Sequence, residues 1–250
     1  MTEIENTIAE FVPISLQEMD GVELMNRTDT KFVVSTEQLL SILQEVKQTY
    51  RILEIDGVRF SRYETLYYDT DDFLFYKRHH NGKRNRWKIR KRSYVESSVS
   101  FLELKFKTNR GRTQKQRTAI PDVSLALNTD EESFIGLKSG LDLNLIPQLK
   151  NGFTRITLVE PSLPERITID LELSFEWNEI LKVLKQIVIV EVKQENRNRL
   201  SPFVQALKKR HVREISLSKY CIGVAMLVPF VKRNNFKEKL IKLNKLESLK

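Results

Sequence analysis

The sequence predicts an α+β fold in which about eight antiparallel strands form a β-tunnel, a barrel with a charged lumen flanked by helices. Two observations predict it. Between residues 84 and 195, several runs alternate charged and apolar residues, as strands do when they send successive side chains to opposite faces. From Ser201 onward the apolar period becomes helical, so strands and helices are segregated along the chain.

The N-terminal third supplies one helix with a clear start and the first strands. Ser35 and Gln38 have the spacing of a capping box, which predicts a helix from there to about Thr49. The Asn81-Gly82 pair is a turn signal. In order, we expect a helical lead-in (1–28), a strand (29–34), the capped helix, strands at about 50–56 and 58–69, and a helical turn from Asp71 to His80.

The middle of the chain is rich in predicted strands, and the C-terminal part is helical. Pro121 and Pro147 bound a polar segment, which we interpret as an insertion with one short helix. The tail has an apolar face that predicts docking against the barrel. The expected strands are 84–95, 99–108, 113–120, 151–160, 165–176 and 186–195, and the expected helices are 202–210, 216–228 and 235–248, the last with Phe236, Leu240, Leu243 and Leu246 on one face. We expect one domain, with a lead-in (1–28), the tunnel and its packing helices (29–228) and a helical tail (229–250).

Composition indicates a globular protein with an anionic partner. The chain has 250 residues, 40% of them hydrophobic, and a net charge of +9 despite 33 acidic residues. Its single cysteine, Cys221, excludes a disulfide within the chain. No apolar run approaches the ~18 residues of a membrane span, and no secretory signal is visible at the N-terminus, so we expect a cytoplasmic protein.

One predicted strand carries an unusual row of cations. The even positions of residues 84–92 are all Lys or Arg, whereas Trp87 and Ile89 lie among the odd positions. Other runs repeat the alternation with mixed charges. Their charged residues are Glu103, Lys105 and Lys107, then Lys115 and Arg117, then Arg166, Asp170 and Glu172, and finally Glu191, Lys193 and Glu195.

A closed sheet would explain these charged faces. A single run of this kind would fit an ordinary sheet with one solvated face. Like charges that lie opposite each other on paired strands repel, so the cationic rows need an anion. In a closed barrel the charges point inward to a polyanion, and the outer apolar faces lie under the helices at 36–48, 201–228 and 235–248. Glu103, Glu172 and Glu191 either neutralise lumen Arg or bind Mg²⁺ or Mn²⁺.

Six short motifs in this order resemble the VTC domain, and together they cover about residues 15–225. They are Arg27-Thr-Asp-Thr-Lys31-Phe, Tyr67-Tyr-Asp-Thr70, Lys88-Ile-Arg90-Lys-Arg92-Ser-Tyr94, Phe101-Leu-Glu103-Leu-Lys105, Glu191-Val-Lys193 and Ser218-Lys219-Tyr220. VTC domains are polyphosphate polymerases of the triphosphate tunnel metalloenzyme superfamily. The resemblance therefore implies a phosphotransferase that moves the γ-phosphate of ATP onto a growing polyphosphate chain, with Mn²⁺ or Mg²⁺.

The resemblance also implies roles for individual residues. Glu191 is expected to hold the metal, and Ser218 to lie beside the phosphates. The family has a further upstream Arg, for which Arg78 is the candidate and His79-His80 the alternative. The residues expected to contact the triphosphate or polymer are Lys31, Arg90, Arg92, Lys105, Arg155 and Lys219. Further candidates for substrate binding are Arg78, Lys88, Glu103, Lys115, Arg117, Arg166, Lys193 and Ser218.

Other functions stay open at this stage. A triphosphatase on the same tunnel would hydrolyse tripolyphosphate or a nucleoside triphosphate, although residues 1–10 lack the Glu-x-Glu-x-Lys strand typical of such hydrolases. A non-catalytic module that binds polyphosphate or nucleic acid is the other alternative, but Trp87 falls on the face opposite the cations, so we expect no nucleic acid. We expect no general base, since an attacking terminal phosphate is already anionic. We also expect Cys221 to be buried, His211 to lie on the surface and His79-His80 to bind no zinc. The tail helix is a possible docking site for another protein.

Overall fold

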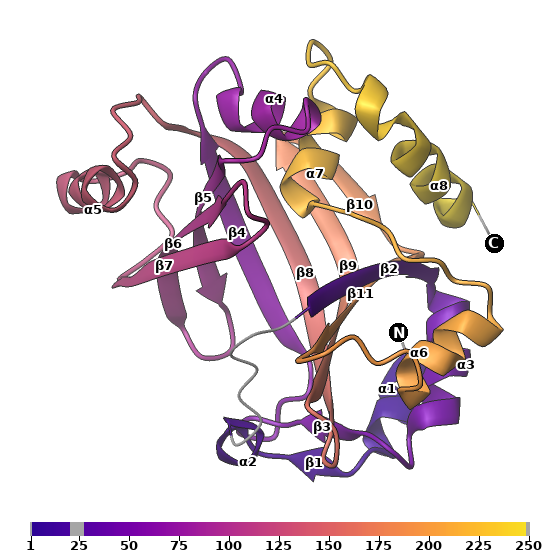
Figure 1. The fold of residues 1–250 in the computed structure, drawn as a ribbon. Helices are drawn as coiled ribbons and strands as arrows, with labels where there is room; N and C mark the ends of the chain where they lie inside the picture. Colours follow the sequence, from indigo (N-terminus) through magenta and orange to yellow (C-terminus); the bar gives the residue numbers. More distant parts are fainter. Residues whose placement is uncertain (1, 21–27, 249–250) are drawn as a thin grey trace.

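An antiparallel sheet with a single long strand path forms the centre of the molecule (Figure 1). The computed structural model describes residues 2–20 and 28–248. In path order the strands are β2 (Thr28–Ser35), β11 (Ile187–Gln194), β9 (Glu165–Trp177), β8 (Ile146–Glu160), β4 (Ser61–Asp69), β5 (Arg86–Tyr94), β6 (Val99–Lys107) and β7 (Thr113–Ile120). Beside this path lie β1 (Pro13–Ile14), β3 (Arg51–Leu53) and β10 (Ile180–Leu184).

The helices follow the predicted order, which confirms the α+β class. Ser35 and Gln38 form the expected capping box, in which the Ser35 hydroxyl accepts from Gln38 N and the Gln38 side chain accepts from Ser35 N, each at 3.1 Å. The helices are α1 (Thr2–Ala9), α2 (Leu16–Asp20), α3 (Thr36–Val46), α4 (Leu74–His80), α5 (Thr129–Ser139), α6 (Pro202–Lys209), α7 (Lys219–Leu227), η1 (Asn234–Phe236) and α8 (Lys237–Glu247). Part of the expected lead-in, with Arg27 of the first motif, lies outside the described residues.

The eight-stranded path has two ends, β2 and β7, and no hydrogen-bonded pairing between them is present in the described residues. The sheet is nevertheless strongly curved, because a single cavity is lined by residues from both ends of the path. We call the face that bears Lys31, Lys88 and Glu191 and bounds this cavity the concave face, and the opposite face the convex face.

Two apolar cores cover the convex face. The first lies under α1, α3 and α6, where side chains such as Leu39 and Phe203 pack on Ile169 and Val190 of β9 and β11 (Figure 1). The second lies under α5 and joins Ile135 to Leu102 and Leu104 of β6. These contacts confirm that the apolar residues between the charged ones face outward and are covered by helices.

The third core lies on the concave face, which the sequence analysis did not expect. It joins α7 and α8 to side chains that share the concave face with the cations, among them Val33, Phe153 and Ile189. Gly223 allows α7 to lie close, because a Cβ there would be 2.6 Å from both Leu149 and Phe175. The helices α7 and α8 therefore cover part of the concave face, and the prediction that they cover the outside is wrong.

The tail helix α8 uses its apolar face within the chain. Phe236 and Leu243 are buried in the third core, and Leu240 and Leu246 are partly buried against it. This confirms docking of the tail on the sheet. Docking of a further protein through the same face would require α8 to leave this core.

A β-bulge changes the predicted face of one acid. Thr154 of β8 pairs with Leu171, whereas Gly152 pairs with Ser174, so β9 has one extra residue at this point. Glu172 occupies the bulge with φ 51°, is exposed, and accepts a 2.8 Å hydrogen bond from Thr154 Oγ1. Glu172 therefore does not point into the lumen, and the bulge places Leu173 on the concave face instead.

Three further expectations need correction. The cationic row has four members on β5, because Asn85 has φ 44° and ends the strand alternation, and the Arg84 guanidinium instead donates to the Asn109 carbonyl at 3.0 Å. β8 begins at Ile146, within the predicted insertion, because Pro147 lies at a register shift where a missing N–H is tolerated. The strand β10 was not predicted.

Within the described part of the chain, no helix combines the length and apolar character needed to cross a membrane. Cys221 is buried in α7 and His211 is exposed after α6, as expected.

Candidate functional site

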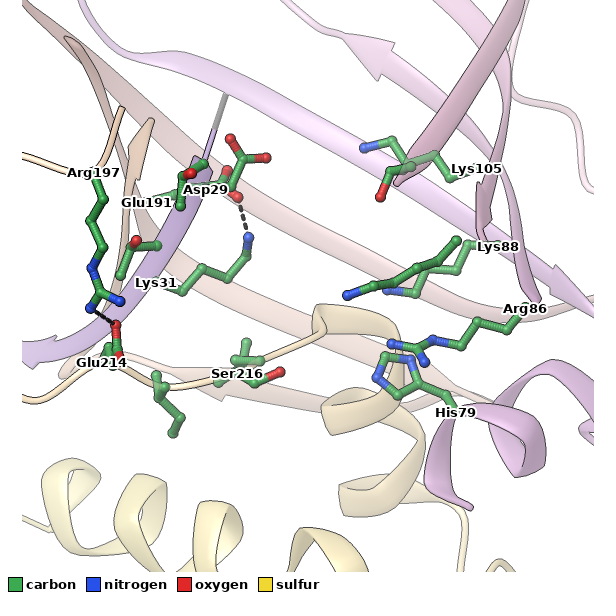
Figure 2. A pocket seen from close by; sticks show the side chains of 16 residues that line it. Asp29, Lys31, His79, Arg86, Lys88, Lys105, Glu191, Arg197, Glu214 and Ser216 are labelled. Atoms are coloured by element: carbon green, nitrogen blue, oxygen red, sulfur yellow. Dashed lines mark hydrogen bonds and ion pairs between the residues drawn. The ribbon is translucent and has the colours of Figure 1, made fainter. Parts of the chain in front are cut away.

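A cavity of about 600 Å³ lies between the two ends of the sheet path (Figure 2). Lys31 and Asp29 of β2 and Glu191 of β11 lie on one side of it, together with Arg197 and Glu214. The opposite side has side chains from α4, β5 and β6, namely His79, Arg86, Lys88 and Lys105. Lys107, which also lines the cavity, lies there too because it pairs with Arg86 in the β5–β6 register. The cavity therefore has a mixed wall and a cationic wall facing each other.

The cationic wall places like charges directly opposite one another. Lys105 of β6 pairs with Lys88 of β5 on one side and with Lys115 of β7 on the other. Arg86 likewise pairs with Lys107. Such pairs repel across a sheet, and they are tolerated only where another interaction compensates for them.

Burial and this repulsion both act on the pKa values of these lysines. Burial, together with neighbouring Arg86 and Arg90, lowers the pKa of Lys88 to about 8. The Arg90 charge, together with burial, brings the pKa of Lys105 well below its usual value. An anion in the cavity would oppose both effects, so the wall is suited to a ligand with several negative charges.

Glu103 neutralises the centre of this wall. Its carboxylate is fully buried from solvent and lies 2.7 Å from Arg90 Nε and 2.5 Å from Lys115 Nζ. Burial opposes ionisation of Glu103, but the Arg90 and Arg92 charges hold its pKa well below the usual range. Arg90 is therefore fixed in place by Glu103, with a further 3.3 Å hydrogen bond to the Tyr67 hydroxyl.

The other wall pairs opposite charges. Glu191 lies opposite Lys31 in the β2–β11 register and forms an ion pair with it, and Lys193 Nζ is 3.6 Å from the same carboxylate. Burial opposes the ionisation of Glu191, but Lys193 and Lys31 lower its pKa to about 2. Glu191 is therefore ionised throughout the neutral pH range.

Asp170 organises two further cations on the concave face. Arg155 donates to both of its oxygens, at 2.6 and 2.8 Å, and Lys219 at the start of α7 forms an ion pair with it. Asp170 is buried and the side chains of Arg155 and Lys219 are mostly buried, and Lys219 Nζ is 4.1 Å from the centre of the Phe153 ring. Burial opposes ionisation of Asp170, but Arg155 and Lys219 hold its pKa well below the usual value.

Arg92 extends the cationic row beyond the cavity. Its Nε donates to Thr65 Oγ1 at 3.1 Å, and its guanidinium lies 5.4 Å from the Tyr63 ring and 5.5 Å from the Phe153 ring. Burial lowers the pKa of Arg92 to about 10, which still leaves it charged near pH 7. Lys88, Arg90 and Arg92 thus form a continuous row along β5, from the cavity to Arg155.

The donor set permits a divalent cation only with help from a ligand. In the described ranges, no group of three or more His, Cys, Asp or Glu side chains is placed to hold a metal ion. Of the three carboxylates that line the cavity, Asp29, Glu191 and Glu214, the first two lie on the paired strands β2 and β11. Mg²⁺ or Mn²⁺ at phosphate sites commonly uses one or two carboxylates plus phosphate oxygens. These two residues fit such an ion. Glu103 and Glu172 do not, because neither lines the cavity: Glu103 is fully buried between Arg90 and Lys115, and Glu172 lies in the bulge.

The structure gathers most of the predicted site residues on the concave face. Lys31, Lys88, Lys105 and Glu191 line the cavity, and Arg90, Arg92, Glu103, Arg155 and Lys219 continue from it. Lys115 and Arg117 are exposed on β7, with Arg117 4.5 Å from the Phe101 ring, and Arg166 pairs with Lys193 in the β9–β11 register.

Two predicted residues lie elsewhere. Arg78 is exposed on α4 and does not line the cavity, whereas the next residue, His79, does. Ser218 caps α7, since its hydroxyl accepts from Cys221 N, and it thereby holds the first turn that carries Lys219.

Sequence reasoning missed the segment that closes one side of the cavity. Residues 214–217 line it, and Ile215 N donates to the Lys31 carbonyl at 2.8 Å. Glu214 also forms a 2.5 Å ion pair with Arg197. The apolar residues of this segment follow neither the period of a strand nor that of a helix. The only sequence signal for its role was its position directly before the Ser218 motif.

Solved structures that match this chain include the following two. A protein from Hippeastrum, described as a candidate adenylyl cyclase with a dominant triphosphatase activity, has a TM-score of 0.51 and 14% identity, over 82% of this chain and 98% of that one. A candidate adenylate cyclase from Bacillus halodurans has a TM-score of 0.45 and 14% identity, over 78% of this chain and 96% of that one. A comparison with curated proteins gave no match.

The family suggested by the six motifs is confirmed by a family model. The model of the VTC domain matches residues 26–228, which include all the concave-face residues described above. The chain belongs to the VTC domain family.

Proposed function

We propose that this chain is an ATP-dependent polyphosphate polymerase, which transfers the γ-phosphate of ATP to a polyphosphate chain held on the concave face. One observation carries the proposal. In a chain of the VTC domain family, a row of buried and partly buried cations runs from the cavity along β5 to the Arg155–Asp170–Lys219 cluster. A row of this kind fits a linear anion that bears a charge on every unit.

The proposal assigns roles by position. Phosphoryl transfer requires phosphates to be held in line and their developing charge to be neutralised, and it requires little covalent chemistry from the protein. Lys31, Lys105 and Lys219 supply point charges, whereas the guanidinium groups of Arg90, Arg92 and Arg155 can each bind two phosphate oxygens. Lys88, Lys115, Arg117, Arg166 and Lys193 complete the basic surface around them.

The curved sheet acts as a tunnel in this proposal. Its two ends approach across the cavity, and residues 29–228 form the tunnel unit, a range supported by the family match at 26–228. The buried Cys221 agrees with a reducing, cytoplasmic setting. Trp87 packs against Phe106 on the convex side, with ring centroids 4.5 Å apart, so it cannot stack nucleic acid bases beside the cations of the concave face.

Asp29 and Glu191 would hold Mn²⁺ or Mg²⁺ together with the phosphates. Such an ion supplies charge neutralisation at the oxygens of the transferred group. The protein itself orients the phosphates through its cations. No general base is needed, because a terminal phosphate is already anionic.

A second candidate activity is hydrolysis of a triphosphate on the same face. The similar fold of the Hippeastrum protein, for which a dominant triphosphatase activity is described, supports this alternative. Both activities use the same phosphate-binding cations. They differ in the acceptor, which is a phosphate chain in one case and water in the other.

Incubation of the purified protein with ATP and Mn²⁺, followed by gel electrophoresis stained for polyphosphate, tests the proposal. We expect a ladder of polymer with release of ADP, and loss of both in Lys219→Ala and Lys105→Met. The second variant removes a repelled charge and should fold at least as well as the parent, so its loss of activity cannot be assigned to unfolding. Lys150→Met, on the exposed convex surface, serves as the matched control and should retain the activity.

Free phosphate without polymer, from a protein with normal tripolyphosphate affinity, would replace the polymerase by the triphosphatase. Tight binding of polyphosphate without turnover would leave only a binding module. Polymer formation by Lys219→Ala at the parental rate would show that the concave face is not the site.

A further inference from the structure

His79 is a histidine in the cationic wall whose side chain has an unused hydrogen-bonding atom. It lies in the last turn of α4, lines the cavity and is drawn beside Arg86 in Figure 2. Its Nδ1 is buried without a hydrogen-bond partner. A buried polar atom without a partner is uncommon, and at the wall of a cavity it indicates a group that a ligand completes.

The other two histidines of the chain differ from it. His80 has its ring nitrogens engaged, with Asn235 N donating to Nε2 at 3.3 Å and Asn81 Oδ1 3.0 Å from Nδ1. It thus anchors α4 to η1 and has a structural role. His211 is exposed after α6 and lies outside the cavity lining.

Positive charges surround His79 from three elements. Arg86 and Lys88 approach from β5, Lys107 from β6 and Lys239 from α8, while the Phe236 ring lies edge-on with its centroid 6.1 Å away. Burial, and then these cations, lower the pKa of His79 to about 3. In the free protein the imidazole is therefore neutral at any pH near 7.

A bound phosphate chain would reverse this balance. Its negative charges would neutralise Arg86, Lys88 and Lys107, and its oxygens would accept hydrogen bonds from the ring. An imidazole that gains a proton has N–H donors at both nitrogens, so Nδ1 could then donate to a phosphate oxygen.

We propose that His79 binds a phosphate oxygen and takes up one proton from solvent when a triphosphate or polyphosphate enters the cavity. The inference rests on the proposed function for the identity of the anion, and it adds a binding residue whose charge exists only in the complex. A neutral ring avoids adding one more repulsive charge to the empty wall. A protonated ring adds one more contact when the anion is present.

Histidine NMR tests this directly, because the chain has only three histidines. Imidazole ¹H–¹³C spectra of the full chain are recorded from pH 5 to 8 with and without tripolyphosphate, and His79→Gln and His211→Gln assign the signals. We expect the His79 signals to stay those of a neutral ring without ligand and to become those of an imidazolium at pH 6.5 with it. The His211 signals should not change on addition of the ligand.

Calorimetry provides the second measurement. Tripolyphosphate binding at pH 6.5, measured in two buffers of different ionisation enthalpy, gives the number of protons taken up. We expect His79→Gln to reduce that number by close to one and to weaken binding about tenfold, as expected for loss of a charge-assisted contact. His79→Arg, which is always charged, should restore affinity without restoring proton uptake.

The outcomes separate this inference from the proposed function. If tripolyphosphate binds tightly and His79 stays neutral, the inference is wrong while the phosphate-binding face remains. If the folded protein does not bind tripolyphosphate at all, the proposed function is wrong and the inference is lost with it. Equal proton uptake by the parent and His79→Gln would also contradict the inference.

Discussion

The two walls of the cavity carry similar side chains in opposite arrangements. On the β5–β7 wall, Lys88, Lys105 and Lys115 lie side by side across three strands, and only Glu103 lies among them. On the β2–β11 wall, Lys31 faces Glu191, and Asp29 pairs in register with Lys193. The first wall repels itself and the second is balanced.

The difference shows which wall depends on a ligand. The balanced wall satisfies its charges within the protein, so it is stable whether or not an anion is present. The cationic wall holds lysines whose pKa values are lowered, so part of the folding free energy is used to keep repelling charges together. An anion would remove this cost. We therefore infer that Glu191 and Asp170 hold their cations in place as scaffold, while the cationic wall gains most from a bound anion.

The largest expected effect comes from removing the negative charge of Asp170, which pairs with Arg155 and Lys219. Asp170→Asn would leave Arg155 and Lys219 buried without their carboxylate. Loss of one partner from a buried ionic cluster costs about 3–5 kcal/mol, so we expect the free energy of unfolding in urea to fall by that amount. Tripolyphosphate should restore part of it by supplying negative charge to the same two cations.

Glu172→Gln is the matched control for this variant. Glu172 lies two residues away on β9 but is exposed in the bulge, with one hydrogen bond to Thr154. We expect a change in unfolding free energy of less than about 0.5 kcal/mol. An equal loss in both variants would mean that any change at this part of β9 disrupts the fold, and the scaffold role of Asp170 would have to be abandoned.

The cationic wall should respond in the opposite direction. Lys105→Met removes the central charge of the three-lysine row, so the free protein should become more stable by about 1 kcal/mol. The same change should weaken tripolyphosphate binding at least tenfold, because a charge-assisted contact is lost. Urea unfolding and calorimetry measure the two effects.

Lys150→Met provides the comparison, since Lys150 forms only an exposed ion pair with Glu176. Both its stability and its affinity should stay close to those of the parent. A Lys105→Met protein that is less stable than the parent would show that the cationic wall is not under repulsion in the free state.

Local sequence patterns predicted the features that are determined within a single strand or helix. The alternation of charged and apolar residues identified the concave faces of β5, β6 and β11, because side-chain direction in a strand follows from position alone. The capping box at Ser35 was also readable, since both of its partners lie within four residues. The resemblance of the six motifs added the family.

Features that depend on tertiary contacts were not predicted. The bulge at Glu172 arises from pairing with β8, and a single extra residue there moves every following side chain to the other face. Similarly, α7 lies on the concave face because Gly223 fits against Leu149 and Phe175, which no helical period reveals. His79 lines the cavity in place of the expected Arg78. Which of the two faces the cavity depends on how α4 is turned about its own axis, and packing determines this, not the motif.

The smallest expected effect is a pH dependence that has opposite signs for binding and stability. Lys88, with a pKa of about 8 in the free protein, loses its charge as pH rises past that value. Bound tripolyphosphate would raise this pKa, so affinity should fall with pH, by about fourfold between pH 7 and 8.5 from this group alone. The free protein should instead gain stability over the range from pH 8 upward, because the unfolded chain, with the ordinary lysine pKa, then binds more protons than the folded one.

Lys88→Met isolates this contribution, because the titration of the ligand and of the other groups is common to both proteins. Calorimetry gives the ratio of the affinity at pH 7 to the affinity at pH 8.5. This ratio should be about four times smaller in the variant than in the parent. Urea unfolding over the same pH range should show a smaller gain in stability in the variant than in the parent, because Lys105 still contributes in both. If the two proteins had the same pH dependence in both measurements, Lys88 would not be a repelled cation in the free protein. The contrast between the two walls would then rest on Lys105 and Lys115 alone.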